Sequence, residues 1–238
     1  MKKKILFLLL SILAFATIQV QAQLSDLHYF PPLKQATFEV AIIQQSLYLS
    51  TSETTPFEIE IFRGTSNTPY TTVTISNTNP GNVPLPNRDN DISLVSNSNT
   101  GVVISNSGLR LQSVGGQKFY ANYRGRNNAQ GTSLTSKGRQ ALGTSFKWGG
   151  LPLGASTNNG VNATLGIMAT EDGTVVNVFG YDTNIAFRLQ EDGFGMTDNT
   201  KQITLNAGQS FVFEVKENGT AAHRDGWLGA SITSNKKI

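Results

Sequence analysis

The sequence predicts an all-β protein that contains repeated four-stranded antiparallel sheets. From Gln23 onward, short runs of alternating apolar and polar residues are separated by Asn, Gly, Ser, Thr and Pro, which is typical of half-buried strands joined by turns. No long segment places apolar residues at the helical period, and only Phe38–Leu49 is ambiguous between helix and strand. We expect the sheets to resemble the blades of a complete or incomplete propeller, with a β-sandwich as the alternative.

The alternating runs predict twelve strands, each bounded by turn residues. In chain order they are Ser46–Ser50, Phe57–Phe62, Thr71–Ile75, Gly101–Ser105, Leu109–Val114, Phe119–Tyr123, Leu165–Ala169, Thr174–Phe179, Ile185–Leu189, Gln202–Leu205, Ser210–Val215 and Leu228–Thr233.

The strands fall into two similar units, at approximately 45–124 and 165–238. Three segments of the first unit are followed, about 120 residues later, by three similar segments in the same order. They are Thr55–Phe62, Thr71–Ile75 and Gly108–Val114 in the first unit, and Gly173–Phe179, Ile203–Leu205 and Gly229–Ser234 in the second. Repetition at a fixed spacing is typical of propellers and of paired sheets.

The two units differ at their ends. The first continues into the predicted strand Phe119–Tyr123, whereas the second reaches Ile238 soon after its last strand. We therefore expect the second unit to lack a closing strand and to leave a sheet edge unpaired. On this interpretation the chain is the N-terminal part of a larger fold.

The first 22 residues are predicted to be a signal peptide. Three lysines at positions 2 to 4 precede the apolar run Ile5–Ile18, and Val20-Gln21-Ala22 is typical of a cleavage site. The apolar run is shorter than the roughly 20 residues that cross a bilayer. We expect residues 23–238 to form a single β-rich domain without a membrane span. It would be exported to the periplasm, the outer-membrane surface or the extracellular space.

Composition excludes several classes of function. The chain has no cysteine and only two histidines, so disulfides, thiolate metal sites and cysteine nucleophiles are absent. Three of its 19 Lys and Arg residues lie in the predicted leader, so the remainder balances 16 acidic residues. A neutral mature chain does not favour nucleic-acid binding. We expect no cofactor.

Basic residues are nevertheless segregated along the chain. No acidic residue occurs between Asp91 and Glu171, a stretch that holds seven Lys and Arg interleaved with aromatic residues. If the fold gathers them on one face, they would suit an acidic polysaccharide or an acidic surface protein. The alternative is that the strands disperse the charges and bury the aromatics. The candidate ligand-binding residues are Tyr123, Arg124, Arg126, Lys137, Arg139 and Trp148.

Catalytic motifs are not found. No Gly-x-Ser-x-Gly sequence occurs, and His223, two residues before Asp225, fits a polar turn better than a general base. Glu171-Asp172-Gly173 and Glu191-Asp192-Gly193 fit hairpin turns better than calcium loops, which need more converging oxygens. We predict no catalytic and no metal-binding residue.

Several phrases, taken together and in order, resemble a known family. They are Leu27–Leu33, Leu134–Gly138, Ala141–Thr144, Ala169–Thr174, Leu205–Ser210 and Arg224–Gly229. This set resembles the N-terminal region of gliding-motility-associated surface proteins of Bacteroidetes, which are exported by the type IX system, and it is similar to the IgG-Fc-binding-protein N-terminal domain. The resemblance spans most of the mature chain and implies adhesion or surface assembly, with no catalytic residues to carry over. The sorting domain usual in that family is not found in this sequence.

Three functions follow as hypotheses. A non-enzymatic adhesion or assembly module at the cell surface comes first, a module that binds acidic glycans second, and an exported glycan-cleaving enzyme third.

Overall fold

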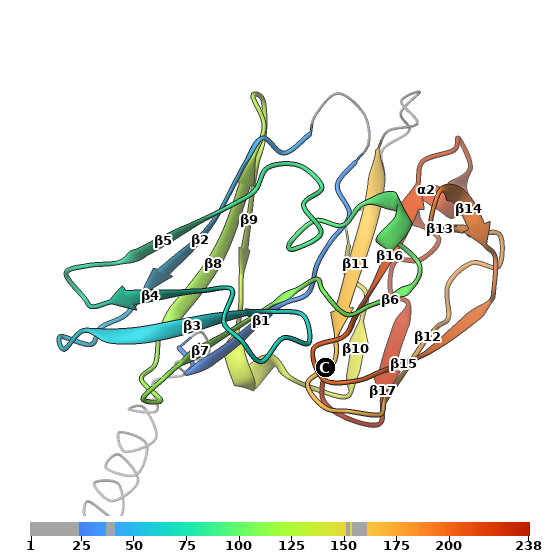
Figure 1. The fold of residues 1–238 in the computed structure, drawn as a ribbon. Helices are drawn as coiled ribbons and strands as arrows, with labels where there is room; N and C mark the ends of the chain where they lie inside the picture. Colours follow the sequence, from blue (N-terminus) through green and yellow to red (C-terminus); the bar gives the residue numbers. More distant parts are fainter. Residues whose placement is uncertain (1–23, 37–40, 151–152, 154–160) are drawn as a thin grey trace, which may run out of the picture.

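The protein is all-β, as predicted. The computed structural model describes residues 24–36, 41–150, 153 and 161–238, so the predicted signal peptide lies outside the described residues. Four sheets of three or four antiparallel strands are arranged like the blades of a four-bladed propeller, and a two-stranded hairpin lies beside them (Figure 1). The predicted repetition of small antiparallel sheets is confirmed.

The first half of the molecule consists of two four-stranded sheets, with strand orders β1-β7-β3-β4 and β5-β2-β8-β9. Their strands are β1 (Leu27–Phe30), β2 (Gln44–Ser50), β3 (Phe57–Arg63), β4 (Thr71–Ile75), β5 (Gly81–Leu85), β7 (Leu109–Ser113), β8 (Tyr120–Arg126) and β9 (Gly131–Thr135). Alternate side chains of both sheets, among them Leu47, Ile59, Leu111 and Ala121, pack into one apolar core. The sheets therefore bury their inner faces against each other.

The second half contains the sheets β10-β17-β12-β15 and β11-β16-β6 and the hairpin β13-β14. Its strands are β6 (Val103–Ile104), β10 (Ser145–Lys147), β11 (Asn162–Met168), β12 (Thr174–Phe179), β13 (Phe187–Leu189), β14 (Asp192–Met196), β15 (Thr200–Leu205), β16 (Ser210–Lys216) and β17 (Ser231–Ser234). A second core, with Phe187, Phe213 and Trp227 near its centre, fills this half.

The two halves share a strand topology. The order β1-β7-β3-β4 in the first half matches β10-β17-β12-β15 in the second, with antiparallel pairing throughout. The antiparallel pair β2-β5 likewise matches β11-β16. The segments that resemble each other in sequence thus occupy corresponding strands.

The unpaired sheet edge expected in the second half does not belong to the last strand. The last strand, β17, does not lie at an open edge, because β10 and β12 pair with its two sides. The strand that has fewer neighbours than its counterpart is β11, whose sole partner among the described strands is β16. The corresponding strand β2 has partners on both sides, β5 and β8.

All twelve predicted strands are present, Thr71–Ile75 and Thr174–Phe179 with the predicted ends and the others with shifted ends, and five further strands among the described residues were not predicted. The strand β5 contains Pro84, a residue more typical of turns than of strands, although alternate residues of β5 are buried. The strand β9 is exposed along its whole length, and β14 begins within the Glu191-Asp192-Gly193 sequence that we predicted to be a turn. The strands β1 and β10 are only three or four residues long. None of the five carries the long apolar alternation that the prediction requires.

Short helical segments connect the strands. They are the 3₁₀ turns η1 (Asn97–Asn99) and η2 (Gly138–Ala141) and the helix α2 (Ala221–Asp225). The polar turn predicted around His223 is this helix, whose N-cap Thr220 accepts a hydrogen bond from the His223 amide.

Candidate functional site

Two of the predicted ligand-binding residues lie on the outer face of the β5-β2-β8-β9 sheet. Arg124 and Arg126 alternate along β8 with residues that enter the core, so both guanidinium groups face away from it. In the register, Arg124 lies opposite Ser46 and Arg126 opposite Gln44 on β2. This outer face is the candidate binding face, and its sheet lies at the upper left in Figure 1.

An aromatic ring accompanies the two arginines. The Arg124 guanidinium carbon lies 4.9 Å from the centroid of the exposed Tyr48 ring, and Arg124 Nε donates to Asn122 Oδ1 at 2.9 Å. Arg126 Nε donates to Gln44 Oε1. These contacts hold both planar groups in place with donors remaining for a ligand.

A shallow hollow of about 230 Å³ lies at this point of the sheet. Its lining residues are Gln44, Ser46, Tyr48, Arg124, Gly125, Arg126, Gly131 and Thr132. The strands β2, β5, β8 and β9 contain no Asp or Glu, so no carboxylate of this sheet neutralises the arginines. Cationic forks, amide groups and an exposed ring are suited to bind an anionic group or an acidic sugar.

Tyr123, which we expected on this face, belongs to the core instead. Its position on β8 directs the ring inward, where it is only 5% exposed, and its hydroxyl donates to Gln45 Oε1 at 2.8 Å. Burial raises the pKa of the Tyr123 hydroxyl, so this group stays protonated. The odd-even alternation of the strand separates Tyr123 from its two arginine neighbours.

The remaining three predicted residues lie elsewhere. Arg139 is bound to Asp26, with Arg139 Nε 2.7 Å from the carboxylate, and this hydrogen bond lowers the pKa of Asp26. Trp148 packs against Trp227 at 4.6 Å between ring centroids and borders a separate pocket, which Lys137 also lines. The six residues thus do not form one site, and the basic residues are dispersed over several surfaces.

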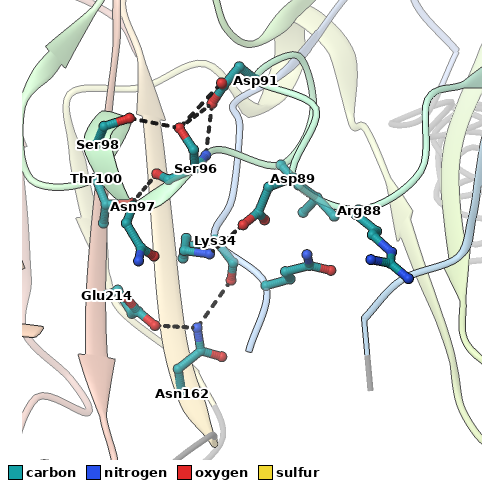
Figure 2. A network of polar contacts seen from close by, with 12 residues as sticks. Lys34, Arg88, Asp89, Asp91, Ser96, Asn97, Ser98, Thr100, Asn162 and Glu214 are labelled. Carbon is teal, nitrogen blue, oxygen red and sulfur yellow. Dashed lines mark hydrogen bonds and ion pairs between the residues drawn. The ribbon is translucent and has the colours of Figure 1, made fainter. Parts of the chain in front are cut away.

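A buried polar network, missed by sequence analysis, joins the two halves (Figure 2). The fully buried Lys34 Nζ lies 2.9 Å from Asp89, and the Lys34 carbonyl accepts from Asn162 Nδ2 at 3.3 Å. Asn162 Nδ2 also donates to Glu214 at 2.8 Å, and Glu214 forms a buried ion pair with Arg188. The signal was an acidic residue inside the otherwise apolar run Ser210–Val215.

Neighbouring loop residues extend this network. The Asp91 carboxylate accepts from the Ser96 amide at 2.7 Å and from the Ser96 hydroxyl at 2.9 Å. Burial opposes ionisation of Asp91, but hydrogen bonds from Asn99 and Ser96 and the charge of Arg63 outweigh it and lower the pKa. The buried charges of Lys34, Arg188 and Glu214 each have a protein partner, which is typical of structural rather than reactive groups.

Neither histidine is placed for proton transfer. His223 is buried, its Nδ1 lies 2.8 Å from the Lys216 carbonyl, and its Nε2 accepts from the Ala186 amide at 3.1 Å. His28 is also buried, with Nε2 2.9 Å from the Phe119 carbonyl. Among the described residues, no three His, Asp or Glu side chains converge as a metal site would require.

Comparison with known proteins gives one family match. Residues 131–238, which are 108 of the 238 residues, match the model of the family described as IgGFc binding protein. The match covers β9 to β17, and it does not reach the phrase Leu27–Leu33 on which the resemblance also drew. Nothing in the comparisons bears on a gliding-motility or Bacteroidetes origin.

The other comparisons add little. No curated protein matches the sequence. One solved chain, from the cryo-EM structure of the T=1 Penaeus vannamei nodavirus, shares 9% identity over 90% of this chain and 83% of its own length, with a TM-score of 0.19. That score is too low to support an argument. Within the ranges described above, no helix is long and apolar enough to traverse a membrane.

Proposed function

We propose that this chain is an exported, non-enzymatic binding module that acts in adhesion or assembly at a cell surface. The observation that carries the proposal is the acid-free outer face of the β5-β2-β8-β9 sheet, where Arg124 lies over the Tyr48 ring and Arg126 follows Arg124 on the same face. The match of residues 131–238 to a family named for binding supports a role in recognition. The sequence resemblance would further place this adhesion or assembly role among gliding-motility-associated surface proteins.

The proposed ligand of the binding face is an acidic polysaccharide. Carboxylated or sulfated sugars combine anionic groups, which arginine forks bind, with flat sugar faces that pack on a tyrosine ring. Because the face is exposed, its attraction for such a ligand should weaken as salt increases.

Retention on a heparin column tests this proposal. The unmodified protein should be retained at low salt and released by added salt. The Arg124→Ala/Arg126→Ala variant should bind immobilised heparin at least about tenfold more weakly, equivalent to about 1.4 kcal/mol. Lys201→Ala/Lys236→Ala removes the same charge in the second half and serves as the control. Equal loss in both variants, or no retention of the unmodified protein, would reject the binding face.

A protein ligand is the second candidate, favoured by the description of the matched family as IgGFc binding protein. Immobilised Fc fragment tests it directly. Binding of Fc that survives Arg124→Ala/Arg126→Ala would assign protein recognition to another surface. The third alternative, an exported glycan-cleaving enzyme, predicts release of shortened sugars from the same polysaccharide, abolished by substitution of a single carboxylate.

A further inference from the structure

The two halves differ at one strand position. In the first half this position, beside β2, is occupied by β8. There, β8 pairs with β2 along its length, and the bonds between Ser25 and Phe119 tie its beginning to the chain before β1. The side chains of Ala121 and Tyr123 from this strand, and of Phe119 just before it, enter the first core. The strand therefore closes the gap between the edges of β1 and β2.

The second half has a corresponding gap between β10 and β11, and the same pair of backbone hydrogen bonds is found at its beginning. Gly143, two residues before β10, exchanges two backbone hydrogen bonds with Ile238, at 2.9 and 3.3 Å. Ser25, two residues before β1, exchanges the corresponding bonds with Phe119, at 2.9 and 3.2 Å. Ile238 thus matches Phe119, and the gap between β10 and β11 matches the position of β8.

An apolar pocket of about 400 Å³ occupies this gap. Phe146 and Trp148 border it from β10 and its end, Leu165 and Ile167 from β11, and Ile232 from β17. In the first half, side chains of β8 fill the corresponding space. The pocket therefore lies between β10 and β11, at the position that β8 occupies in the first half. None of the described residues of the second half forms a strand there.

The backbone of β11 is oriented to accept a strand. The Glu217 amide donates to the Val161 carbonyl, and the Ala169 amide donates to the Gln209 carbonyl, so the odd-numbered residues between them direct their backbone groups toward β16. Asn162, Thr164, Gly166 and Met168 therefore direct their N–H and C=O groups toward the opposite, unpaired edge. One face of β11 is covered by residues 31–34, as at Gly166 and Thr164, but the edge itself has no described strand beside it.

The charge around the pocket restricts the partner. The residues that line it include Lys137 and Lys147 and no Asp or Glu. A ligand with acidic residues beside its apolar ones would complement this rim.

We propose that the groove between β10 and β11 binds an extended strand of another protein by β-augmentation. The strand adds to the β11 edge in antiparallel orientation, as β8 adds to β2. Alternate apolar side chains fill the pocket, and acidic residues on either side meet Lys137 and Lys147. Backbone hydrogen bonds supply affinity in this mode, and the pocket supplies selection for side chains.

A synthetic peptide provides the probe. It carries the sequence of Phe119–Tyr123 between two glutamates, with blocked ends. A matched peptide has proline in place of the asparagine, because the Asn122 backbone of β8 faces β2, whereas the Ala121 carbonyl accepts from the Ser136 amide on the other side. Proline lacks the amide that a strand ladder uses, so it should weaken binding at least about tenfold. Fluorescence anisotropy of labelled peptide measures both affinities with the full chain.

Two protein variants locate the site. Ala141 is exposed and borders the pocket, so Ala141→Trp should obstruct the groove and reduce peptide affinity at least about tenfold, whereas Ala141→Ser should leave it unchanged. Lys137→Glu/Lys147→Glu should weaken binding about three- to tenfold, since exposed charges act mainly through screened attraction.

Hydrogen exchange separates strand addition from other occupants. The peptide should protect the amides of Thr164, Gly166 and Met168, because these point to the free edge. Binding without this protection would indicate an apolar ligand site and overturn the proposal. Equal affinity for the proline peptide would overturn it too, as would self-association of the chain that Ala141→Trp abolishes, which would assign the groove to a second copy.

Discussion

The two halves of this protein use the same strand topology but stabilise it differently. The core of the first half is closed by β8, and Gln45 and Tyr123, which meet beside this core, are uncharged and bonded to each other. The buried charge of Lys34 lies outside that core, at the contact between the halves. The described part of the second half has no strand that corresponds to β8, and this half buries a charged pair, Arg188 and Glu214, beside its core. Two halves with the same strand topology can therefore be stabilised by different interactions.

The largest expected effect lies in the second half. Glu214→Gln removes the charge that pairs with the buried Arg188 guanidinium, and an unpaired buried charge costs about 3–5 kcal/mol. The free energy of unfolding, measured by urea denaturation, should fall by that amount. Glu58→Gln, at an exposed position of β3, should change it by less than about 0.5 kcal/mol.

Replacement of both members of the pair sharpens this test. Arg188→Met/Glu214→Leu removes both charges and should recover much of the lost stability, because apolar side chains of similar size can replace a buried ion pair. If Glu214→Gln alone lowers the free energy of unfolding by less than about 1 kcal/mol, the buried ion pair does not distinguish the stability of the second half from that of the first.

A smaller effect is expected at His28 in the first half. Burial lowers the pKa of His28 below 6.5, opposed by its hydrogen bond to the Phe119 carbonyl. Between the lowered pKa and 6.5 the unfolded chain binds more protons than the folded one. The stabilisation from neutral His28 is therefore complete above pH 6.5 and is lost as the pH falls below it.

Thermal unfolding between pH 7.5 and pH 5 measures the His28 effect. The midpoint temperature should decline over this range in the unmodified protein, and the decline should be shallower in His28→Gln. An identical decline in both proteins would exclude His28 as its source. Asp26 acts in another window, since its lowered pKa places the loss of its stabilisation below about pH 4.

The smallest effect concerns the ion pair between Arg139 and Asp26. Both side chains are substantially exposed, so the pair should contribute only about 0–1 kcal/mol. Arg139→Ala should reduce the free energy of unfolding by no more than this, and added salt should narrow the difference. A larger loss would mean that Arg139 holds η2 against the start of β1.

Sequence analysis identified the strands with long alternation, and it identified the repeat, because sheet burial dictates the period of two. It missed β5 and β9, whose proline and exposed polar residues resemble turns. The site was predicted only in part. Arg124 and Arg126 share a face since they are two residues apart on one strand, whereas Tyr48 reaches them only through strand pairing.

The polar network illustrates the limit of such prediction. Glu214 stands out in its apolar strand, but its partner Arg188 lies 26 residues earlier, and nothing local connects them. Lys34, Asp89 and Asn162 come from three distant segments that only the folded arrangement of the two halves brings together. Long-range contacts of this kind leave no periodic signal in a single sequence.

The contact at Gly166 sets how closely the two halves can approach. A methyl group added to this residue would lie 2.0 Å from the Pro32 carbonyl oxygen, so even alanine would collide with main chain that cannot rotate away. The β11 backbone at Gly166 can therefore lie this close to Pro32 only because the side chain of glycine is a hydrogen atom. Any larger residue at this point would wedge the molecule open along its middle.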